Sequence, residues 1–253
     1  MKAPALTLSV VSHAQGELVD LLLGDLARFV STPLRVVLTL NMREPEERWV
    51  NRDFPFPIEI IRNASPKGFG ANHNAALTRA TTEFFCVINP DIRLSDDPFQ
   101  ALIKEIANSR IGVIAPSVTR PDLVAEDHAR NFPSIFTLAA KVTGHRPRVT
   151  PPPGQKLYFP DWVAGMFMLF RSEILRSVGG FDERYFLYYE DVDLCARLRE
   201  RGFEVAVCPA TSVIHAARRE SRRNIRYASW HLRSAIRFLW TRPGIAFGMK
   251  RRP

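Results

Sequence analysis

The sequence of 253 residues has little cysteine and no long apolar run. Its three cysteines, Cys86, Cys195 and Cys208, are odd in number and widely spaced, which argues against a disulfide framework and against a zinc site. The longest apolar run, 163–170, has eight residues, whereas a transmembrane helix needs roughly 20. The first residues also lack the apolar stretch of a secretory signal. We therefore expect a globular protein of a reducing, cytoplasmic compartment.

Acidic residues are almost missing from the end of the chain. Positions 214–253 contain eleven Lys or Arg and a single acid, Glu220, whereas the remainder contains 24 bases and 25 acids. The net charge of +9 therefore resides in this tail. Such an asymmetry predicts an anionic partner: a membrane surface, a nucleic acid or a phosphorylated substrate.

A helix is predicted over 222–240, within the basic tail. Its apolar residues fall on one face, with arginines beside them: Ile225, Ala228, Leu232, Ala235, Ile236 and Leu239. This form is typical of a helix that lies on an anionic bilayer, and a terminal helix packed on the body of the protein has the same pattern. We expect no nucleic-acid partner, because no binding motif accompanies the charge.

Short apolar strands alternate with amphipathic helices over the first 115 residues. Strands are predicted at 6–12, 34–40, 58–62, 83–88 and 111–115, and helices at 17–29, 72–80 and 98–109. This alternation predicts βαβ units, and therefore an α/β fold with a mainly parallel sheet flanked by helices.

The second half of the chain is less regular. Residues 117–160 are rich in proline toward their end and predict a long excursion, with a short helix around 135–142, of the kind that forms lids or binding segments. Beyond it we expect a strand at 162–171, a helix at 172–178, a helix that begins near Glu190 or Asp191, and a last strand at 203–207.

Three carboxylates, Glu190, Asp191 and Asp193, fall within four positions directly after an aromatic run, 185–189. Acids are ordinary at a helix start, because the free N–H groups and the helix dipole favour negative charge. Aromatic neighbours exclude water, however, and raise the pKa of a carboxyl group, as a general base requires. The cluster is therefore a candidate for acid–base chemistry.

Asn89-Pro90-Asp91 follows the strongly apolar strand predicted at 83–88. Ligands of open α/β sheets bind outside the carboxyl ends of strands, and an acid there can hold a divalent cation that bridges a diphosphate. The same residues are also good turn formers. His215 follows the last predicted strand, where an imidazole serves either as the nitrogen ligand of such a cation or as a structural group.

A glycine-rich turn, 67–74, opens the helix predicted at 72–80. Glycine lets the backbone approach a ligand, and the N–H groups at a helix start point outward. The turn has neither the GxGxxG pattern nor the P-loop pattern. A plain loop before a helix N-cap explains it equally well.

Taken in chain order, these segments resemble the family 2 glycosyltransferases, and specifically the bacterial rhamnosyltransferase-like branch that builds lipopolysaccharide or cell-wall glycans. The resemblance covers roughly 6–240 and rests on the strand VVS, on RNASPKGFGANHNAAL, on VINPDI, on the segment 162–205 and on a downstream histidine. It implies a GT-A fold, with a Rossmann-like nucleotide-sugar half at 1–115, an acceptor half at 116–213 and a basic helical tail at 214–253.

The resemblance also implies an inverting transferase that uses a divalent cation, Mn²⁺ or Mg²⁺. The donor would be a nucleotide-sugar, dTDP- or UDP-linked, and the acceptor a lipid-linked or cell-surface glycan. Lipid-linked acceptors favour a place at the inner face of the cell membrane, with the tail at 222–240 on the anionic surface.

Site residues carry over from the family motif by motif. Asp91 matches the metal ligand of the DxD-like element, with Asn89 in place of the first acid, and His215 matches a late histidine that approaches the metal or the diphosphate. Asp191 matches the catalytic base, with Glu190 as the nearby alternative. The segments that line the donor site, and that lie between donor sugar and acceptor, match Gly68, Phe69, Gly70, Asn74, Trp162, Ala164 and Gly165.

One departure concerns the nucleobase. The family usually ends its second strand in Asp-Asn-x-Ser, whose Asp contacts the base, whereas this chain has Thr-Leu-Asn-Met at 39–42. Asn41 offers a polar contact there, and Glu44 is an acid close by. The usual Tyr-Asn after the first strand is His13-Ala14.

Two other functions stay open at this point. The missing acid favours a non-catalytic GT-A-like binding or scaffold protein, which the intact Glu190-Asp191 pair opposes. A nucleotidyltransferase of similar fold would carry a glycine-rich loop with Arg and Lys near the start, and 12–17 has neither. A hydrolase with two carboxylates needs no metal–diphosphate site, so the Asp91 motif and His215 argue against it.

Overall fold

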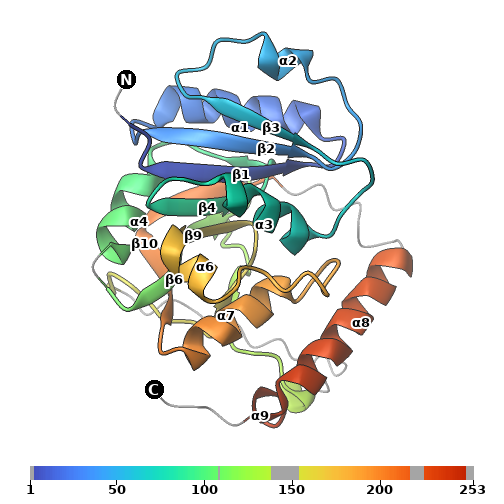
Figure 1. Cartoon of the computed structure of the whole chain (residues 1–253). Helices are drawn as coiled ribbons and strands as arrows, with labels where there is room; N and C mark the ends of the chain where they lie inside the picture. The colour runs from blue at the N-terminus through green and yellow to red at the C-terminus, as the bar shows by residue number, and fades with distance from the viewer. Residues whose placement is uncertain (1–2, 108, 138–153, 217–224, 249–253) are drawn as a thin grey trace.

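An eight-stranded sheet forms the centre of the protein (Figure 1), in a computed structural model that describes residues 3–107, 109–137, 154–216 and 225–248. The strand order is β3-β2-β1-β4-β9-β6-β10-β5, and β7 pairs with β8 in a small second sheet. The strands are β1 Leu6–Ser12, β2 Leu34–Leu40, β3 Ile58–Arg62, β4 Phe84–Ile88, β5 Ile92–Arg93, β6 Ile111–Thr119, β7 Ala129–Arg130, β8 Trp162–Val163, β9 Phe167–Arg171 and β10 Glu204–His215.

Helices cover both faces of this sheet. They are α1 Gly16–Phe29, α2 Glu47–Val50, α3 Phe69–Arg79, α4 Pro98–Ile106, α6 Ser172–Ser177, α7 Glu190–Glu200, α8 Ile225–Thr241 and α9 Pro243–Ala246. The pairings β1–β2, β1–β4, β2–β3 and β6–β10 are parallel, whereas β9 runs antiparallel to both β4 and β6. The predicted α/β fold with a mainly parallel sheet is confirmed.

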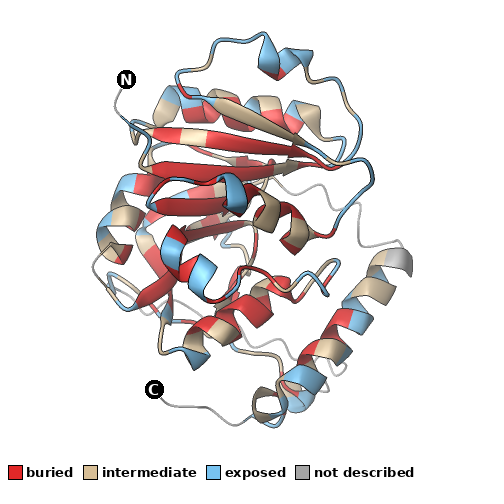
Figure 2. Cartoon of the chain, viewed as in Figure 1, coloured by how far each residue is buried: buried red, intermediate tan, exposed pale blue. Residues whose placement is uncertain are grey.

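Buried side chains alternate between two cores, one on each face of the sheet. In β4, for example, Cys86 and Ile88 join the core under α1 and α4, while Phe85 and Val87 join the core under α3, α6 and α7. This alternation follows from the two-residue period of a strand. Because both faces are covered, the strands β1, β2, β4, β6 and β9 are apolar and buried along most of their length (Figure 2).

Two predicted strands differ from the observed ones. The strand predicted at 162–171 is divided into β8 and β9, because the N–H of Gly165 donates to the Asp191 carboxylate instead of to a neighbouring strand. The last strand continues beyond 207 to His215, with a register shift between Cys208 and Ser212. Pro209 lies within that shift and has no N–H to offer a ladder.

Two predicted helices fall partly outside the described residues. Of the helix expected around 135–142, residues 135–137 are helical and the remainder is not described. Of the tail helix expected at 222–240, the described part is α8 and begins at Ile225. None of the described helices is long and apolar enough to span a membrane.

Helix α8 packs beside the loop that leads into α7 (Figure 1). Ala235 and Phe238 are buried in a third apolar cluster, against Tyr185, Tyr189, Val192 and Ala196. The Ser234 hydroxyl donates to the Leu187 carbonyl at 2.9 Å. Directly after α8, the Arg242 guanidinium reaches Asp193 of α7 at 3.0 Å and Glu200 at 2.5 Å. One side of the tail helix is therefore held against the body by both apolar and charged contacts.

The other side of α8 is exposed. Leu232, Ile236 and Trp240 are 61%, 56% and 86% exposed, and they are spaced four residues apart, so they form one stripe. The predicted apolar face of this helix is therefore divided, because Ala235 turns toward the body while Leu232 and Ile236 face outward.

Candidate functional site

Asp91 and His215 meet at the carboxyl ends of β4 and β10. Asp91 comes three residues after the end of β4, and the next two residues form β5. Strand β5 pairs antiparallel with the end of β10, so that His215 lies opposite Ile92. The His215 Nε2 atom is 3.2 Å from the Asp91 carboxylate, and its Nδ1 atom is 3.8 Å from that of Glu126. The long β10 and the short β5 therefore bring together two residues that are more than a hundred positions apart.

The charge around His215 favours its protonated form. Burial lowers the pKa of His215, but the hydrogen bond and charge of Asp91, together with the charge of Glu126, outweigh burial and raise the pKa above its ordinary value. The second oxygen of Asp91, Oδ1, is buried and has no hydrogen-bond partner in the described residues. An unpartnered carboxylate oxygen beside an imidazole is a donor set that suits a divalent cation, and the imidazole would lose its proton on binding the metal.

Two tyrosines in the left-handed conformation precede the candidate base. Tyr188 and Tyr189 have φ angles of 70° and 69°, a region that non-glycine residues rarely adopt. The turn ends in α7, whose first two residues are Glu190 and Asp191. Such a conformation costs of order 1–3 kcal/mol for each residue and tends to be retained at functional sites.

The Asp191 carboxylate is held by two backbone donors. Its Oδ2 atom accepts the N–H of Gly165 at 2.9 Å, and its Oδ1 atom accepts the N–H of Val192 at 2.8 Å. Glu190 is buried, and its Oε2 atom has no partner in the described part of the chain. Asp191 is therefore the oriented carboxylate of the pair.

Both carboxyl groups are harder to ionise than in water. Burial raises the pKa of Asp191, while the N–H groups of Gly165 and Val192 and the charge of Arg130 act in the opposite direction. Burial and the neighbouring Asp191 raise the pKa of Glu190. Because a general base works best when its pKa approaches the operating pH, these raised values suit a proton acceptor.

Gly165 and Met166 connect the two carboxylate sites. The Met166 carbonyl accepts the N–H of Asn89, two residues before Asp91, at 2.9 Å. The N–H of Gly165 donates to Asp191. The two candidate sites, a hundred residues apart in sequence, thus contact the same two-residue segment between β8 and β9.

The glycine-rich turn contacts the same region. A side chain on Gly165 would come within 2.9 Å of the Phe69 ring, and one on Gly68 within 2.6 Å of the Phe186 carbonyl. That carbonyl accepts the N–H of Phe69 at 2.9 Å. Gly70 lies equally close to Phe181. These glycines are required for close packing between the predicted donor segment, the loop before α7 and the segment that holds Asp191.

A family model described as "Glycosyltransferase like family 2" matches residues 4–234. The chain belongs to this glycosyltransferase family. It is 32% identical over 187 residues to rhamnosyltransferase WbbL of Escherichia coli strain K12, with 68% of this chain and 70% of that protein covered. It is 24% identical over 232 residues to an N-acetylglucosaminyl-diphospho-decaprenol L-rhamnosyltransferase of Mycobacterium tuberculosis, with coverage of 81% and 74%.

A solved structure supports the fold. GalNAc-T7 with UDP, GalNAc and Mn²⁺ superposes with a TM-score of 0.72 at 14% identity, over 94% of this chain and 48% of that one. The chain thus spans about half the length of this structural relative. The predictions of a GT-A fold, of a family 2 glycosyltransferase and of its rhamnosyltransferase-like branch are confirmed.

Asn41 and Asn74, two asparagines of the predicted donor site, form hydrogen bonds with the backbone of loops in the glycosyltransferase. Asn41 is buried, and its side chain accepts the Lys67 N–H at 2.8 Å and donates to the Lys67 carbonyl at 3.0 Å. Asn74 accepts the N–H of Phe181 and donates to its carbonyl. Both side chains therefore support the glycine-rich turn and its surroundings. Their contact with a nucleotide-sugar stays a prediction.

Arg130 and Glu126 are site residues that the sequence did not reveal. Arg130 lies in β7, which pairs with β8, so its guanidinium sits 5.5 Å over the centroid of the Trp162 ring. Its positive charge partly opposes the rise that burial causes in the pKa of Asp191. Trp162 itself donates to the Asn131 carbonyl at 3.0 Å. No sequence motif identifies either residue, because both belong to the segment 117–160 and approach the site only when this segment pairs with other strands.

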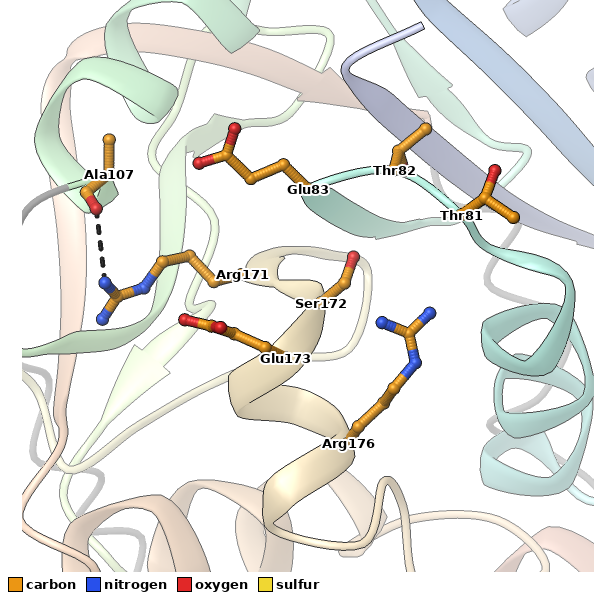
Figure 3. Close-up of a pocket in the computed structure, with 8 residues that line it drawn as sticks. All are labelled: Thr81, Thr82, Glu83, Ala107, Arg171, Ser172, Glu173 and Arg176. Carbon is orange, nitrogen blue, oxygen red and sulfur yellow. Dashed lines mark hydrogen bonds between the residues drawn. The ribbon is translucent and has the colours of Figure 1, made fainter.

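A cavity of about 290 Å³ lies at the amino end of β4 (Figure 3), whereas Asp91 follows the carboxyl end of this strand. Thr82 and Glu83, just before β4, line it together with Arg171 and Arg176. Arg171 donates to the Ala107 carbonyl at 3.3 Å and Arg176 to the Ala80 carbonyl at 2.5 Å. Glu83 and Glu173, which also lines the cavity, offset these two bases, so the cavity has no charge preference that would indicate a ligand.

Proposed function

We propose that the protein transfers a sugar from a dTDP- or UDP-linked donor to a lipid-linked or cell-surface glycan acceptor, with inversion at the anomeric carbon. The observation that carries the proposal is the Gly165–Met166 segment, which hydrogen-bonds Asp191 on one side and the backbone before Asp91 on the other. A proton acceptor and an anion-stabilising site at one segment suit in-line displacement. The names of the Escherichia coli and Mycobacterium tuberculosis relatives support sugar transfer, and the latter names a diphospho-decaprenol acceptor.

In this mechanism Asp191 accepts the proton of the acceptor hydroxyl. The N–H groups of Gly165 and Val192 fix the orientation of its carboxylate, so the basic oxygen needs no reorganisation during the reaction. Glu190 is the nearby alternative, and its burial keeps it protonated at a higher pH than an exposed glutamate.

Asp91 and His215 would hold a divalent cation, Mn²⁺ or Mg²⁺. When bound, the cation supplies positive charge that offsets the charge developing on the departing diphosphate. The free Oδ1 of Asp91 fits this role. Among the described residues, no group of three His, Cys, Asp or Glu side chains could hold a metal by itself, so the diphosphate would complete the coordination.

Thermal shift against a panel of nucleotide-sugars tests this function. We expect one donor to raise the melting temperature in the presence of Mn²⁺ and to have little effect without it, because ligand at about 100 times its Kd stabilises by roughly 2.7 kcal/mol. Product analysis of the same donor with a lipid-linked acceptor then separates a transferase from a scaffold protein. Binding without any transfer would favour the scaffold, and the absence of a shift with every donor would contradict the proposal.

We also propose that α8 holds the enzyme at an anionic membrane surface on its cytoplasmic side. The exposed stripe of Leu232, Ile236 and Trp240, and the absence of acids from the helix, support this proposal. We expect cosedimentation with anionic vesicles that weakens with salt, and loss of it in Ile236→Ser/Trp240→Ser. Leu21→Ser, an exposed apolar residue of α1, is the matched control. Full recovery of the wild-type protein in the supernatant at low salt would refute the proposal.

A further inference from the structure

A groove of about 650 Å³ runs between α8 and the loop at 184–186. Its walls include Phe186 of the loop and Trp230, Ile236 and Trp240 of α8. The rings of Phe186 and Trp230 are in contact, with centroids 4.8 Å apart. The groove therefore lies where the tail helix meets the segment that leads to the candidate base.

The groove is strongly basic. Of the residues that the structure describes, three arginines and no acid line it. Arg184 is paired, because its guanidinium donates to both oxygens of Asp182 at 2.7–2.9 Å. Arg233 and Arg237, in contrast, have no carboxylate within ion-pair distance in the part of the chain that the structure describes. The Arg237 guanidinium lies over the Tyr185 ring, 6.0 Å from its centroid, which leaves its N–H groups without a carboxylate partner among the described residues. Two guanidinium groups without such a partner, one turn apart, suit a ligand with several anionic oxygens.

The same groove continues into an apolar surface. Ile236 and Trp240 belong both to its wall and to the exposed stripe, which Leu232 extends by one helical turn. A ligand that satisfies both features has a multiply charged anionic head and a long apolar chain. An inorganic phosphate satisfies only the first feature, and an uncharged isoprenoid only the second.

Backbone contacts connect the groove to the candidate active site. The Phe186 carbonyl accepts the N–H of Phe69 in the predicted donor segment. Ser234, also in the groove wall, donates to the carbonyl of Leu187. The next residues are the two strained tyrosines and then Glu190 and Asp191. A head group bound in the groove would therefore lie on the loop that carries the base.

We propose that this groove binds the diphosphate and the first isoprenoid units of a lipid-linked acceptor, with Arg233 and Arg237 on the diphosphate. The inference rests on the proposed function, whose acceptor is a glycan linked to such a lipid. Contact with the loop before Asp191 favours the substrate over bulk phospholipid, because membrane attachment alone requires only the outward stripe. The sugar linked to the diphosphate then extends from the groove toward Asp191.

Direct binding of farnesyl diphosphate tests the groove without any enzymatic assay. Trp230 and Trp240 line it, so titration should change the intrinsic tryptophan fluorescence. We expect Arg233→Gln/Arg237→Gln to weaken this binding by about tenfold or more, because hydrogen bonds between guanidinium and phosphate groups are stronger than those between neutral groups. Arg28→Gln, which removes an exposed arginine on α1, should leave binding unchanged. Farnesol and inorganic diphosphate should each bind more weakly than farnesyl diphosphate.

Three results would overturn the inference. The double variant could bind farnesyl diphosphate as tightly as the wild type does, or the wild type could bind farnesol as tightly as farnesyl diphosphate. The double variant could also lose binding to anionic vesicles while it still binds farnesyl diphosphate. The last result would assign the arginines to bulk phospholipid. The single variant Arg233→Gln, at an exposed position, serves if the double variant misfolds.

Steady-state kinetics provide a second readout. The double variant should raise KM for an isoprenoid-diphosphate-linked acceptor about tenfold, while KM for the nucleotide-sugar stays the same. An unchanged acceptor KM contradicts the groove. A wild-type protein without transfer to any acceptor contradicts the proposed function instead, and the fluorescence titration still decides the groove.

Discussion

Asp191→Asn is expected to lower kcat by roughly 10²- to 10⁴-fold, the usual contribution of a general base, while nucleotide-sugar binding persists. An amide has nearly the shape of a carboxylate but accepts no proton from the acceptor hydroxyl. The Asp191 carboxylate accepts the N–H of Gly165 with one oxygen and the N–H of Val192 with the other. An amide has a single acceptor oxygen, so one of these N–H groups loses its partner. The loss of that bond costs about 1–3 kcal/mol of stability, which partly offsets the relief from a buried charge.

The measurements are single-turnover rates, thermal shift with the donor, and the melting temperature of the free variant. Glu190→Gln is the matched control, because it alters the adjacent carboxyl without touching the oriented one. If Asp191→Asn keeps normal turnover while Glu190→Gln loses it, the base is Glu190. Normal turnover in both variants would remove the cluster from the mechanism.

The pH profile checks the same assignment independently. A base must be ionised to act, so kcat/KM falls as the pH drops through its pKa. Burial raises the pKa of Asp191 above the ordinary 3.8, and the acid limb should therefore lie at higher pH than for an exposed aspartate. Asp191→Asn should abolish this limb.

Asp91→Asn is expected to reduce turnover by about 10²- to 10³-fold and to remove the effect of Mn²⁺ on donor binding, since electrostatic stabilisation of a leaving group commonly contributes this much. The substitution removes the negative charge beside His215 and the free carboxylate oxygen that suits a cation. The pKa of His215 should fall with it, because the Asp91 hydrogen bond and charge raise it.

Asp96→Asn, which neutralises an exposed acid five residues away, is the matched control. Turnover and thermal shift should be measured over a range of Mn²⁺ concentrations for both variants. Identical metal dependence in the wild type and in Asp91→Asn would exclude Asp91 as a ligand. Histidine titration by NMR reports separately whether the Asp91–His215 contact exists in solution.

Local sequence patterns predicted most of the sheet and the helices on it. Strand β4 shows why, since each of its side chains lies in one of the two cores and an apolar run is the only composition that suits both faces. The acids at the start of α7 and the Asn-Pro-Asp turn after β4 were also visible, because helix starts and strand ends have local residue preferences. The sequence alone did not show which carboxylate is oriented.

Long-range contacts determined the remaining features of the candidate site. The break between β8 and β9 depends on Asp191, whose carboxylate accepts the N–H of Gly165. The apolar pattern alone predicts that Gly165 belongs to a continuous strand. The pairing of β5 with the end of β10 brings His215 to Asp91, and the pairing of β7 with β8 brings Arg130 close enough to affect the pKa of Asp191. None of these contacts has a local signature, because the partners are far apart in the chain.

The basic tail shows the same division. Composition alone established its charge, and the order of its residues established the amphipathic period of α8. Packing decided which residues face the body, since Ala235 is small enough to approach the loop at 185–189 while Ile236 points away. The ion pair between Arg242 and Asp193 forms only when α7 and α8 lie side by side. Periodicity is a property of neighbouring residues, whereas the direction of a helical face depends on the surface against which it packs.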